Sequence, residues 1–186
     1  MLVKGTALHA NRKFVLARFG EEGLDRWFAA LPKASQSILN GVILETAWYP
    51  VVEGLIAPTR AVAELFFAGD INAGAMEVGR FSAEHGLRGI YRIFVKIAPP
   101  TVVIDRGTRI IKTYYDPIEM EIAELTKNAF TLRFSKMDAP SSVIDHRIAG
   151  WIQRALQICG TQDLVTEVVR SAHDVQGSTE IAGHWS

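Results

Sequence analysis

The stretch that decides the fold is residues 117–160, PIEMEIAELTKNAFTLRFSKMDAPSSVIDHRIAGWIQRALQICG. Apolar and polar residues alternate over 118–122 and again over 130–134. A period of two is typical of β-strands with one buried face. We therefore predict that these two segments are strands that pair as a hairpin.

The length of the turn between the strands follows from which side chains must share a face. A two-residue loop at 127–128 would place Ile122 opposite Arg133. A three-residue loop at 127–129 places Ile122 opposite Phe134 and keeps the apolar side chains together. The sequence therefore predicts a three-residue turn.

A helix follows, and its start and stop signals are clear. Pro140 precedes it, Ser142 and Asp145 have the spacing of a capping box, and Gly160 follows its last turn. Its predicted buried face consists of Ile144, Ile148, Ile152, Ala155 and Cys159. Segments 164–173 and 179–185 are then predicted to form a second hairpin that turns at 174–177.

Residues 1–116 show helical spacing instead. The predicted helices run over 24–31, ending at Pro32; from Pro50 to Gly69, with a kink or break at Pro58; from a cap at Asp70 to about Phe81; over 87–95; and from Pro99-Pro100 towards Asp116. We predict an α+β fold in one domain, 1–186. Its helical part (1–116) packs on a four-stranded antiparallel sheet (117–186) of order strand–strand–helix–strand–strand.

Composition excludes several classes of protein. The 186 residues include 20 Lys+Arg and 20 Asp+Glu, so the chain lacks the net positive charge of a general nucleic-acid binder. The single cysteine excludes internal disulfides and a four-cysteine zinc site. Without an export signal or a long apolar run, we expect a cytoplasmic protein with no membrane span.

The five histidines do not form a recognisable metal site. No two have the i, i+4 spacing of a helical metal pair, and HExxH is absent. In the predicted second hairpin, His173 and His184 would lie roughly 20 Å apart along the strands, too far to share a metal. We therefore predict no metal.

Other polar and aromatic groups each allow two interpretations. Cys159 is either a small core residue or, with a histidine beside it, a nucleophile. Arg106, Arg109 and Lys112 form either a patch for an anion or partner, or a solvated helix face. The aromatic residues that either fill the core or wall a ligand site are Trp48, Tyr49, Tyr91, Phe94 and Trp151. The pairs Asp105-Arg106 and Asp145-His146 are interpreted as solvated helix surface.

The order of elements and several short motifs resemble the haem-NO/oxygen-binding (H-NOX) superfamily, whose relatives include 4-vinyl-reductase-type domains and TRAPP subunits. The motifs at the N-terminus are Val3-Lys4-Gly5-Thr6, Phe19-Gly20 and Trp27. Further stretches are similar to an uncharacterised, haem-less paralogous family abundant in myxobacteria: Trp48-Tyr49-Pro50, Gly79-Arg80-Phe81, Gly86-Leu87-Arg88-Gly89-Ile90-Tyr91 and Tyr114-Tyr115-Asp116-Pro117. The resemblance covers nearly the whole chain and implies the same fold.

An H-NOX domain binds haem through a proximal histidine and holds the propionates with a Tyr-x-Ser-x-Arg motif. The resemblance places His85, fourteen residues before Pro99, at the first position. It places Ile122, Glu124 and Thr126 at the second. The replaced arginine removes the fork that holds a carboxylate, and the histidine falls at a predicted helix start. We therefore predict no cofactor.

The predicted function is a non-enzymatic regulatory or binding module for an apolar small ligand or a partner protein, with no catalytic residues. The alternative is a haem-based sensor of NO or O₂ with His85 as axial ligand, and a Cys159-dependent enzyme is a third hypothesis. We also expect a homodimer, because related domains pair and because segments 65–67, 102–103 and 110–111 carry more apolar residues than one stripe needs. Alternatively, these residues line an internal cavity.

Overall fold

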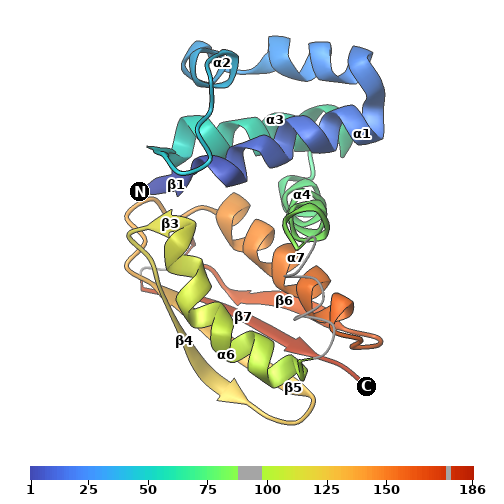
Figure 1. The fold of residues 1–186 in the computed structure, drawn as a ribbon, viewed down its shortest axis with the longest axis vertical. Coiled ribbons are helices and arrows are strands. Elements are labelled where there is room, and N and C mark those ends of the chain that lie inside the picture. Colours follow the sequence, from blue (N-terminus) through green and yellow to red (C-terminus); the bar gives the residue numbers. More distant parts are fainter. Residues whose placement is uncertain (88–97, 175–176) are drawn as a thin grey trace.

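The computed structural model describes residues 1–87, 98–174 and 177–186. Its helices are α1 (Gly5–Ala30), α2 (Lys33–Asn40), a π-helical turn η1 (Val52–Ile56), α3 (Ala57–Phe66), α4 (Ile71–Gly86), α6 (Pro100–Ile110), a 3₁₀ turn η2 (Ile111–Thr113) and α7 (Ser142–Ile158). Its strands are β1 (Leu2–Lys4), β2 (Trp48–Pro50), β3 (Tyr115–Asp116), β4 (Glu119–Leu125), β5 (Ala129–Ser135), β6 (Val165–Arg170) and β7 (Thr179–His184). Helices α1 to α3 lie at one end of the molecule and the larger sheet at the other, with α4 and α7 between them (Figure 1). The fold is α+β, as predicted.

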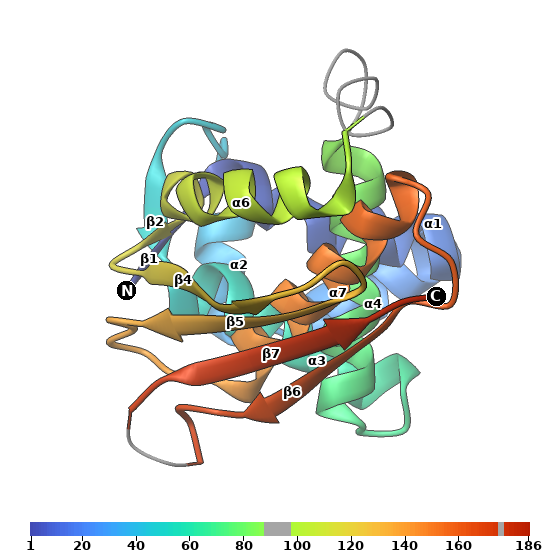
Figure 2. The ribbon, with the colours of Figure 1, turned by 90° about the horizontal axis from the view of Figure 1, so that it is seen from below.

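The larger sheet has four antiparallel strands in the order β4-β5-β7-β6, which confirms the prediction of two hairpins side by side. Helix α6 lies against β4, and α7 lies against β6 and β7 (Figure 2). One face is apolar and buried, as Phe130, Leu132 and Phe134 of β5 show. On the other face, Arg133 forms ion pairs of 2.9 Å with both Glu121 and Glu180.

The turn between β4 and β5 differs from the prediction. It is a two-residue loop, 127–128, closed by a backbone hydrogen bond of 2.9 Å, so the predicted three-residue turn is wrong. A bulge at Ala123 takes up the extra residue instead, and Ile122 pairs with Leu132 rather than with Phe134. The bulge restores the alternation that a longer loop was expected to preserve.

A small antiparallel sheet, of order β2-β1-β3, lies within the part predicted to be all helical. Pro50 ends β2, so its prediction as the first residue of a helix is wrong. The helix begins after it as the π-helical turn and continues as α3, with Pro58 in the first turn of α3. Because proline has no N–H to donate, the predicted break takes the form of a change from π-helical to α-helical pairing.

The long first helix was predicted only in part. Helix α1 starts far before residue 24, bends at Gly20, where φ is 69°, and ends before Pro32 as expected. Helix α2 was not predicted. The predicted helix over 87–95 lies outside the described residues except for its first residue.

Helix boundaries further along the chain agree better with the sequence. Asp70 caps α4, its carboxylate accepting a hydrogen bond from the Ala73 N–H at 2.9 Å, but α4 passes the predicted end at Phe81. Helix α6 begins at Pro100, as predicted, but it ends at Ile110, and η2 and β3 occupy the rest of the segment predicted to be helical.

Helix α7 ends where the sequence predicted but begins with a different cap. Ser141 is the N-cap, and its hydroxyl accepts a hydrogen bond from the Val143 N–H at 3.3 Å. The predicted capping box of Ser142 and Asp145 is wrong, because the Asp145 side chain is turned towards β6 and β7. Gly160, with φ of 100°, follows the C-terminus.

Candidate functional site

A cavity of about 350 Å³ lies where α1, α4, α6, α7 and β4 meet. The larger apolar side chains that line it are Phe81, Ile110, Ile111, Met120, Ile148, Trp151 and Ile152. Its titratable groups are His9, Lys13, Glu45, His85, Tyr114, Tyr115 and Arg147. The volume lies at the lower end of the range of small-molecule pockets, and a few polar groups among apolar walls are typical of such pockets. We therefore identify this cavity as the candidate site.

Two glycines allow α4 and α7 to cross closely enough to form one wall of the cavity. A Cβ atom on Gly79 of α4 would lie 2.2 Å from the carbonyl oxygen of Arg147. A Cβ atom on Gly150 of α7 would lie 2.2 Å from the carbonyl oxygen of Met76. The backbone of each helix therefore occupies the space that a side chain on the other would need.

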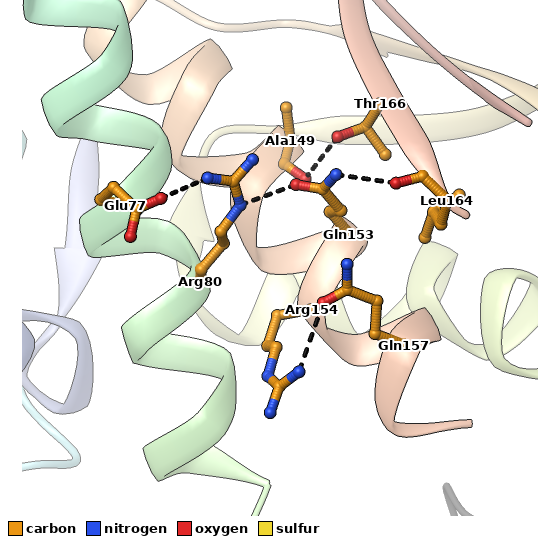
Figure 3. Close-up of polar contacts among 8 residues, drawn as sticks. All are labelled: Glu77, Arg80, Ala149, Gln153, Arg154, Gln157, Leu164 and Thr166. Atoms are coloured by element: carbon orange, nitrogen blue, oxygen red, sulfur yellow. Dashed lines mark hydrogen bonds and ion pairs between the residues drawn. The ribbon is translucent and has the colours of Figure 1, made fainter. Parts of the chain in front are cut away.

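A row of polar contacts beside these glycines fixes the two helices to each other and to the sheet (Figure 3). On α4, Arg80 forms an ion pair with Glu77, and its Nε donates to Gln153 Oε1 at 2.7 Å. The Gln153 Nε2 donates to the Leu164 carbonyl oxygen, just before β6, at 2.9 Å. The position of α7, and of every side chain it carries into the cavity, is thus set from both sides.

His85 lines the cavity from the last turn of α4, not from a helix start as the sequence predicted. Its Nδ1 lies 2.9 Å from the carbonyl oxygen of Phe81. A carbonyl oxygen only accepts, so Nδ1 is the donor in this contact, and Nε2 is the ring nitrogen left for a ligand in the cavity. The imidazole stacks on the Phe81 ring with centroids 3.7 Å apart, which fixes its orientation.

Arg147 brings a buried positive charge to the cavity, since only 4% of the residue is exposed. Its Nη1 donates to Asn11 Oδ1 of α1 at 2.6 Å and to Thr59 Oγ1 of α3 at 2.7 Å. No Asp or Glu in the described part of the chain forms an ion pair with it. Burial lowers the pKa of this guanidinium because it disfavours the charged form.

Tyr115 lies beside Arg147 and does not supply the missing negative charge. The residue is buried, and burial raises the pKa of its phenol, although the nearby guanidinium opposes this effect. A phenol with a raised pKa is neutral at physiological pH. The cation therefore has only neutral groups around it in the described structure.

Asp145 precedes Arg147 by two residues and is also buried, with 1% exposed, so its interpretation as solvated surface is wrong. Its carboxylate accepts hydrogen bonds from Ser171 Oγ at 2.6 Å and from Thr179 Oγ1 at 2.9 Å. Burial raises the pKa of this carboxyl, and the two hydroxyl hydrogen bonds partly oppose the shift. Residues i and i+2 do not share a helix face, and Asp145 serves the second hairpin instead of the cavity.

The three positions to which the resemblance assigned a propionate-binding motif do not meet at the cavity. Ile122 and Glu124 lie in β4 and Thr126 follows it, and none of them lines the cavity; Met120 is the lining residue from β4.

The cationic run on α6 and η2 is exposed, as expected for a solvated face. Arg106, Arg109 and Lys112 do not line the cavity. Lys112 lies 3.8 Å from the carboxylate of Glu119 in β4. The structure thus favours the solvated face over an anion patch.

The predicted aromatic group divides between several environments. Trp151 lines the cavity, and the Tyr49 hydroxyl accepts a hydrogen bond from the Leu44 N–H at 2.9 Å. Trp48 is 38% exposed and does not line the cavity, so neither interpretation holds for it. It is the first residue of the edge strand β2, where the Lys4 ammonium lies 3.8 Å from its ring centroid. The two remaining members, 91 and 94, lie outside the described residues.

Much of the apolar surplus of the helices is used inside the chain. Phe66 stacks on Phe19 with ring centroids 4.0 Å apart, and Phe67 stacks on Phe14 at 6.3 Å. The pair 110–111 lines the cavity. This arrangement supports the cavity that the sequence left open as the alternative to a dimer interface.

Cys159, at the C-terminal end of α7, is half-buried and packs against the core. Its Sγ lies 3.2 Å from the Ala155 carbonyl oxygen, and burial raises the pKa of the thiol to about 11. A thiol with a raised pKa is a poor nucleophile at neutral pH.

Within residues 1–87, 98–174 and 177–186, no group of three or more His, Cys, Asp or Glu is arranged to hold a metal, and no helix is long and apolar enough to cross a membrane.

Arg147 is the buried charged residue of the site, and sequence reasoning did not single it out. A signal was present, because α7 has buried residues on nearly every side between 143 and 153. An arginine between apolar pairs at 143–144 and 148–149 leaves no polar face for it to occupy. The sequence could not show which helices would surround it.

Comparison with solved structures shows a whole-chain likeness to H-NOX proteins. An H-NOX protein from S. oneidensis in the Fe(II)NO ligation state superposes with a TM-score of 0.73 at 15% identity, covering 98% of this chain and 99% of that one. The Fe(II) unliganded H-NOX protein from K. algicida has a TM-score of 0.69 at 14% identity, with 98% and 96% covered. An NMR structure of a mutant H-NOX domain from Shewanella oneidensis in the Fe(II)CO ligation state has a TM-score of 0.65 at 17% identity, with 98% of each chain covered.

No family model and no curated protein sequence matches the chain. At identities this low, the likeness is one of fold. The similarity to a haem-less myxobacterial family stays a prediction. The chain has an H-NOX-like α+β fold, with an apolar-walled pocket between the helical part and the sheet.

Proposed function

We propose that this chain is a non-enzymatic ligand-binding module, a sensor or regulator, that holds a small molecule in the cavity. The observation that carries the proposal is the cavity itself, with an oriented imidazole and a buried guanidinium among apolar walls. The H-NOX neighbours, which are described in ligation states with NO or CO, use the same fold around a bound group. Because the walls come from both the helical part and the sheet, a ligand that prefers one packing of these parts shifts the equilibrium between packings.

Native mass spectrometry of freshly purified protein is the first test, since it reports the mass of any bound molecule. The matched test fills the cavity: Gly107 of α6 lines it, and a Cβ there meets only the Met120 Cε, at 3.4 Å. We expect Gly107→Leu to abolish binding of the fluorophore 1-anilinonaphthalene-8-sulfonate, which has an aromatic body and one negative charge. Thr108→Leu, at the next position and outside the lining, is the control and keeps binding. Equal binding by both variants would place the fluorophore elsewhere and contradict the proposal.

Haem with His85 as axial ligand is the second candidate, and the described residues meet its requirements in part. The Nε2 of His85 is available as an axial nitrogen, and Arg147 is a partner for one propionate. The cavity volume of about 350 Å³ favours a ligand smaller than a tetrapyrrole. We therefore propose a smaller ligand, and no step of the proposed function depends on haem.

Visible spectroscopy separates the two candidates. Protein expressed with a haem precursor should lack a stoichiometric Soret band. A band that disappears in His85→Ala would establish the haem sensor and overturn the proposal.

We further propose that residues 1–186 form a single domain that works as a homodimer in the cytoplasm. An apolar side chain that supports an interface remains on α6, where Val102 is 36% exposed and does not line the cavity. Light scattering after size exclusion should give the mass of two chains at micromolar concentration. The mass of one chain, unchanged on concentrating, would contradict the dimer.

A further inference from the structure

Three arginines on α4 and α7 differ in whether the protein supplies their counter-charge. Arg80 pairs with Glu77, and Arg154 pairs with Glu84 at 2.5 Å. Both arginine side chains are about one-third exposed, at 35% and 37%. Arg147 is the most deeply buried of the three, yet it has no carboxylate partner in the described structure. The cation that most needs a counter-ion is the one for which these residues provide none.

The groups around Arg147 also leave hydrogen-bond donors in excess. Asn11 accepts from Arg147 through Oδ1, while its Nδ2 is buried and has no hydrogen-bond partner among the described residues. The Thr59 hydroxyl donates to the Leu55 carbonyl oxygen at 2.7 Å and accepts from Arg147. Because this hydroxyl is neutral, it does not balance the charge of the guanidinium. Neither Asn11 nor Thr59 lines the cavity, so the guanidinium is the group that a ligand in the cavity can reach, and a guanidinium is complementary to an anionic acceptor.

The cavity beside Arg147 determines the rest of the ligand. Ile110, Ile111, Met120 and Trp151 line it and offer apolar contacts to a hydrocarbon or aromatic body. Among the described residues that line the cavity, the one carboxylate belongs to Glu45, which is exposed. The cavity therefore combines an apolar volume with one deep positive charge.

We propose that the ligand is an organic monocarboxylic acid, whose carboxylate pairs with the Arg147 guanidinium and whose apolar body fills the cavity. This inference rests on the proposed function, because it names the chemical class of the molecule held there. A carboxylate carries one charge for one guanidinium and is flat enough for two parallel hydrogen bonds to its donors. A negatively charged ligand would also give Arg147 the counter-charge that the described residues do not supply.

The test compares acids with alcohols of the same shape. Titration calorimetry is run on the full chain with octanoate against 1-octanol, and with 2-naphthoate against 2-naphthol. We expect at least one acid to bind tenfold or more tightly than its alcohol. Arg147→Met should lose this preference while still binding the alcohol, and Arg147→Lys should keep part of it because the charge remains.

Arg154→Met is the matched control, since Arg154 lies on the same helix but does not line the cavity, and it should show the wild-type preference. Equal affinity of acid and alcohol for the wild type, or an unchanged preference in Arg147→Met, would overturn the inference and leave the ligand-binding cavity intact. Binding of neither member of either pair would overturn the proposed function itself. If Arg147→Met does not fold by circular dichroism, the comparison of Arg147→Lys with the wild type decides between these outcomes.

Discussion

Two buried charges, Asp145 and Arg147, lie two residues apart on α7 and face opposite parts of the molecule. Asp145 is turned towards β6 and β7, where the Ser171 and Thr179 hydroxyls donate to its two oxygens. Arg147 is turned towards α1 and α3 and borders the cavity. Both are less than 5% exposed, yet each has different surroundings.

The difference lies in how far the fold satisfies each charge. The carboxylate has a hydrogen-bond donor on each oxygen and holds the second hairpin against α7. The guanidinium has only neutral partners, Asn11, Thr59 and Tyr115, and the described structure gives it no counter-charge. A fully satisfied buried charge indicates a structural role, whereas an unsatisfied one beside a cavity indicates a binding role.

Separating α7 from α4 should disturb both regions at once and have the largest effect. In Gly79→Ala the new methyl group would meet the Arg147 carbonyl oxygen, so we expect a loss of about 3 kcal/mol in the free energy of unfolding. Urea denaturation measures it. Gly86→Ala, with nothing within 4 Å of the new Cβ, is the control and should lose nothing. Equal stability of both variants would mean that the helices do not cross at this glycine.

Removing the satisfied charge should cost less but clearly destabilise the protein. Asp145→Ala leaves the Ser171 and Thr179 hydroxyls buried without their acceptor, and we expect a loss of about 2 kcal/mol. Ser142→Ala serves as control, since Ser142 does not cap α7 and should change stability little. If Asp145→Ala has the same midpoint of denaturation as the wild type, the carboxylate does not hold the second hairpin against α7.

Removing the charge of Arg147 should stabilise the protein, whereas removing that of Asp145 destabilises it. Without ligand, Arg147→Met replaces a buried cation by an apolar side chain, and we expect a gain of about 1 kcal/mol. The Thr59 hydroxyl still donates to the Leu55 carbonyl oxygen in this variant. Thermal denaturation of ligand-free protein measures the change. A loss of several kcal/mol would show that Arg147 is as structural as Asp145.

The carboxylate should also leave a signature in the pH dependence of stability. The pKa of Asp145 is raised above its ordinary value of 3.8, so the folded state binds the proton more tightly than the unfolded chain. Stability therefore falls as the pH rises from 3.8 through the raised pKa, and Asp145→Asn removes this fall. In urea titrations, the free energy of unfolding of Asp145→Asn should increase relative to that of the wild type as the pH rises. Parallel curves for the two proteins would rule out the raised pKa.

The smallest effect is expected at the end of the same helix. Cys159→Ala should lose about 1 kcal/mol, an ordinary value for a partly buried side chain. Since the pKa of the thiol is about 11, native protein should react with a thiol reagent much more slowly than unfolded protein. Rapid labelling of the native protein would show an accessible, reactive thiol and would favour the hypothesis of a Cys159-dependent enzyme.

The sequence by itself determined the elements whose signals are local. The alternation over 118–122 and 130–134 predicts two strands, and Gly160 marks the end of α7, because neighbouring residues alone set these patterns. For two hairpins with a helix between them, the simplest arrangement is a four-stranded antiparallel sheet. The α+β fold follows from these elements.

Only the tertiary structure decided the features that join distant segments. Strands of two or three residues, such as β1 and β3, are too short to show a period, and the bulge at Ala123 depends on its partner strand. The contact of Gly79 with α7 and the opposite surroundings of Asp145 and Arg147 depend on partners far away in the chain. Burial of a charge is a property of everything packed around it. A pattern within one helix cannot show whether that surrounding is a hydroxyl, a carboxylate or a cavity.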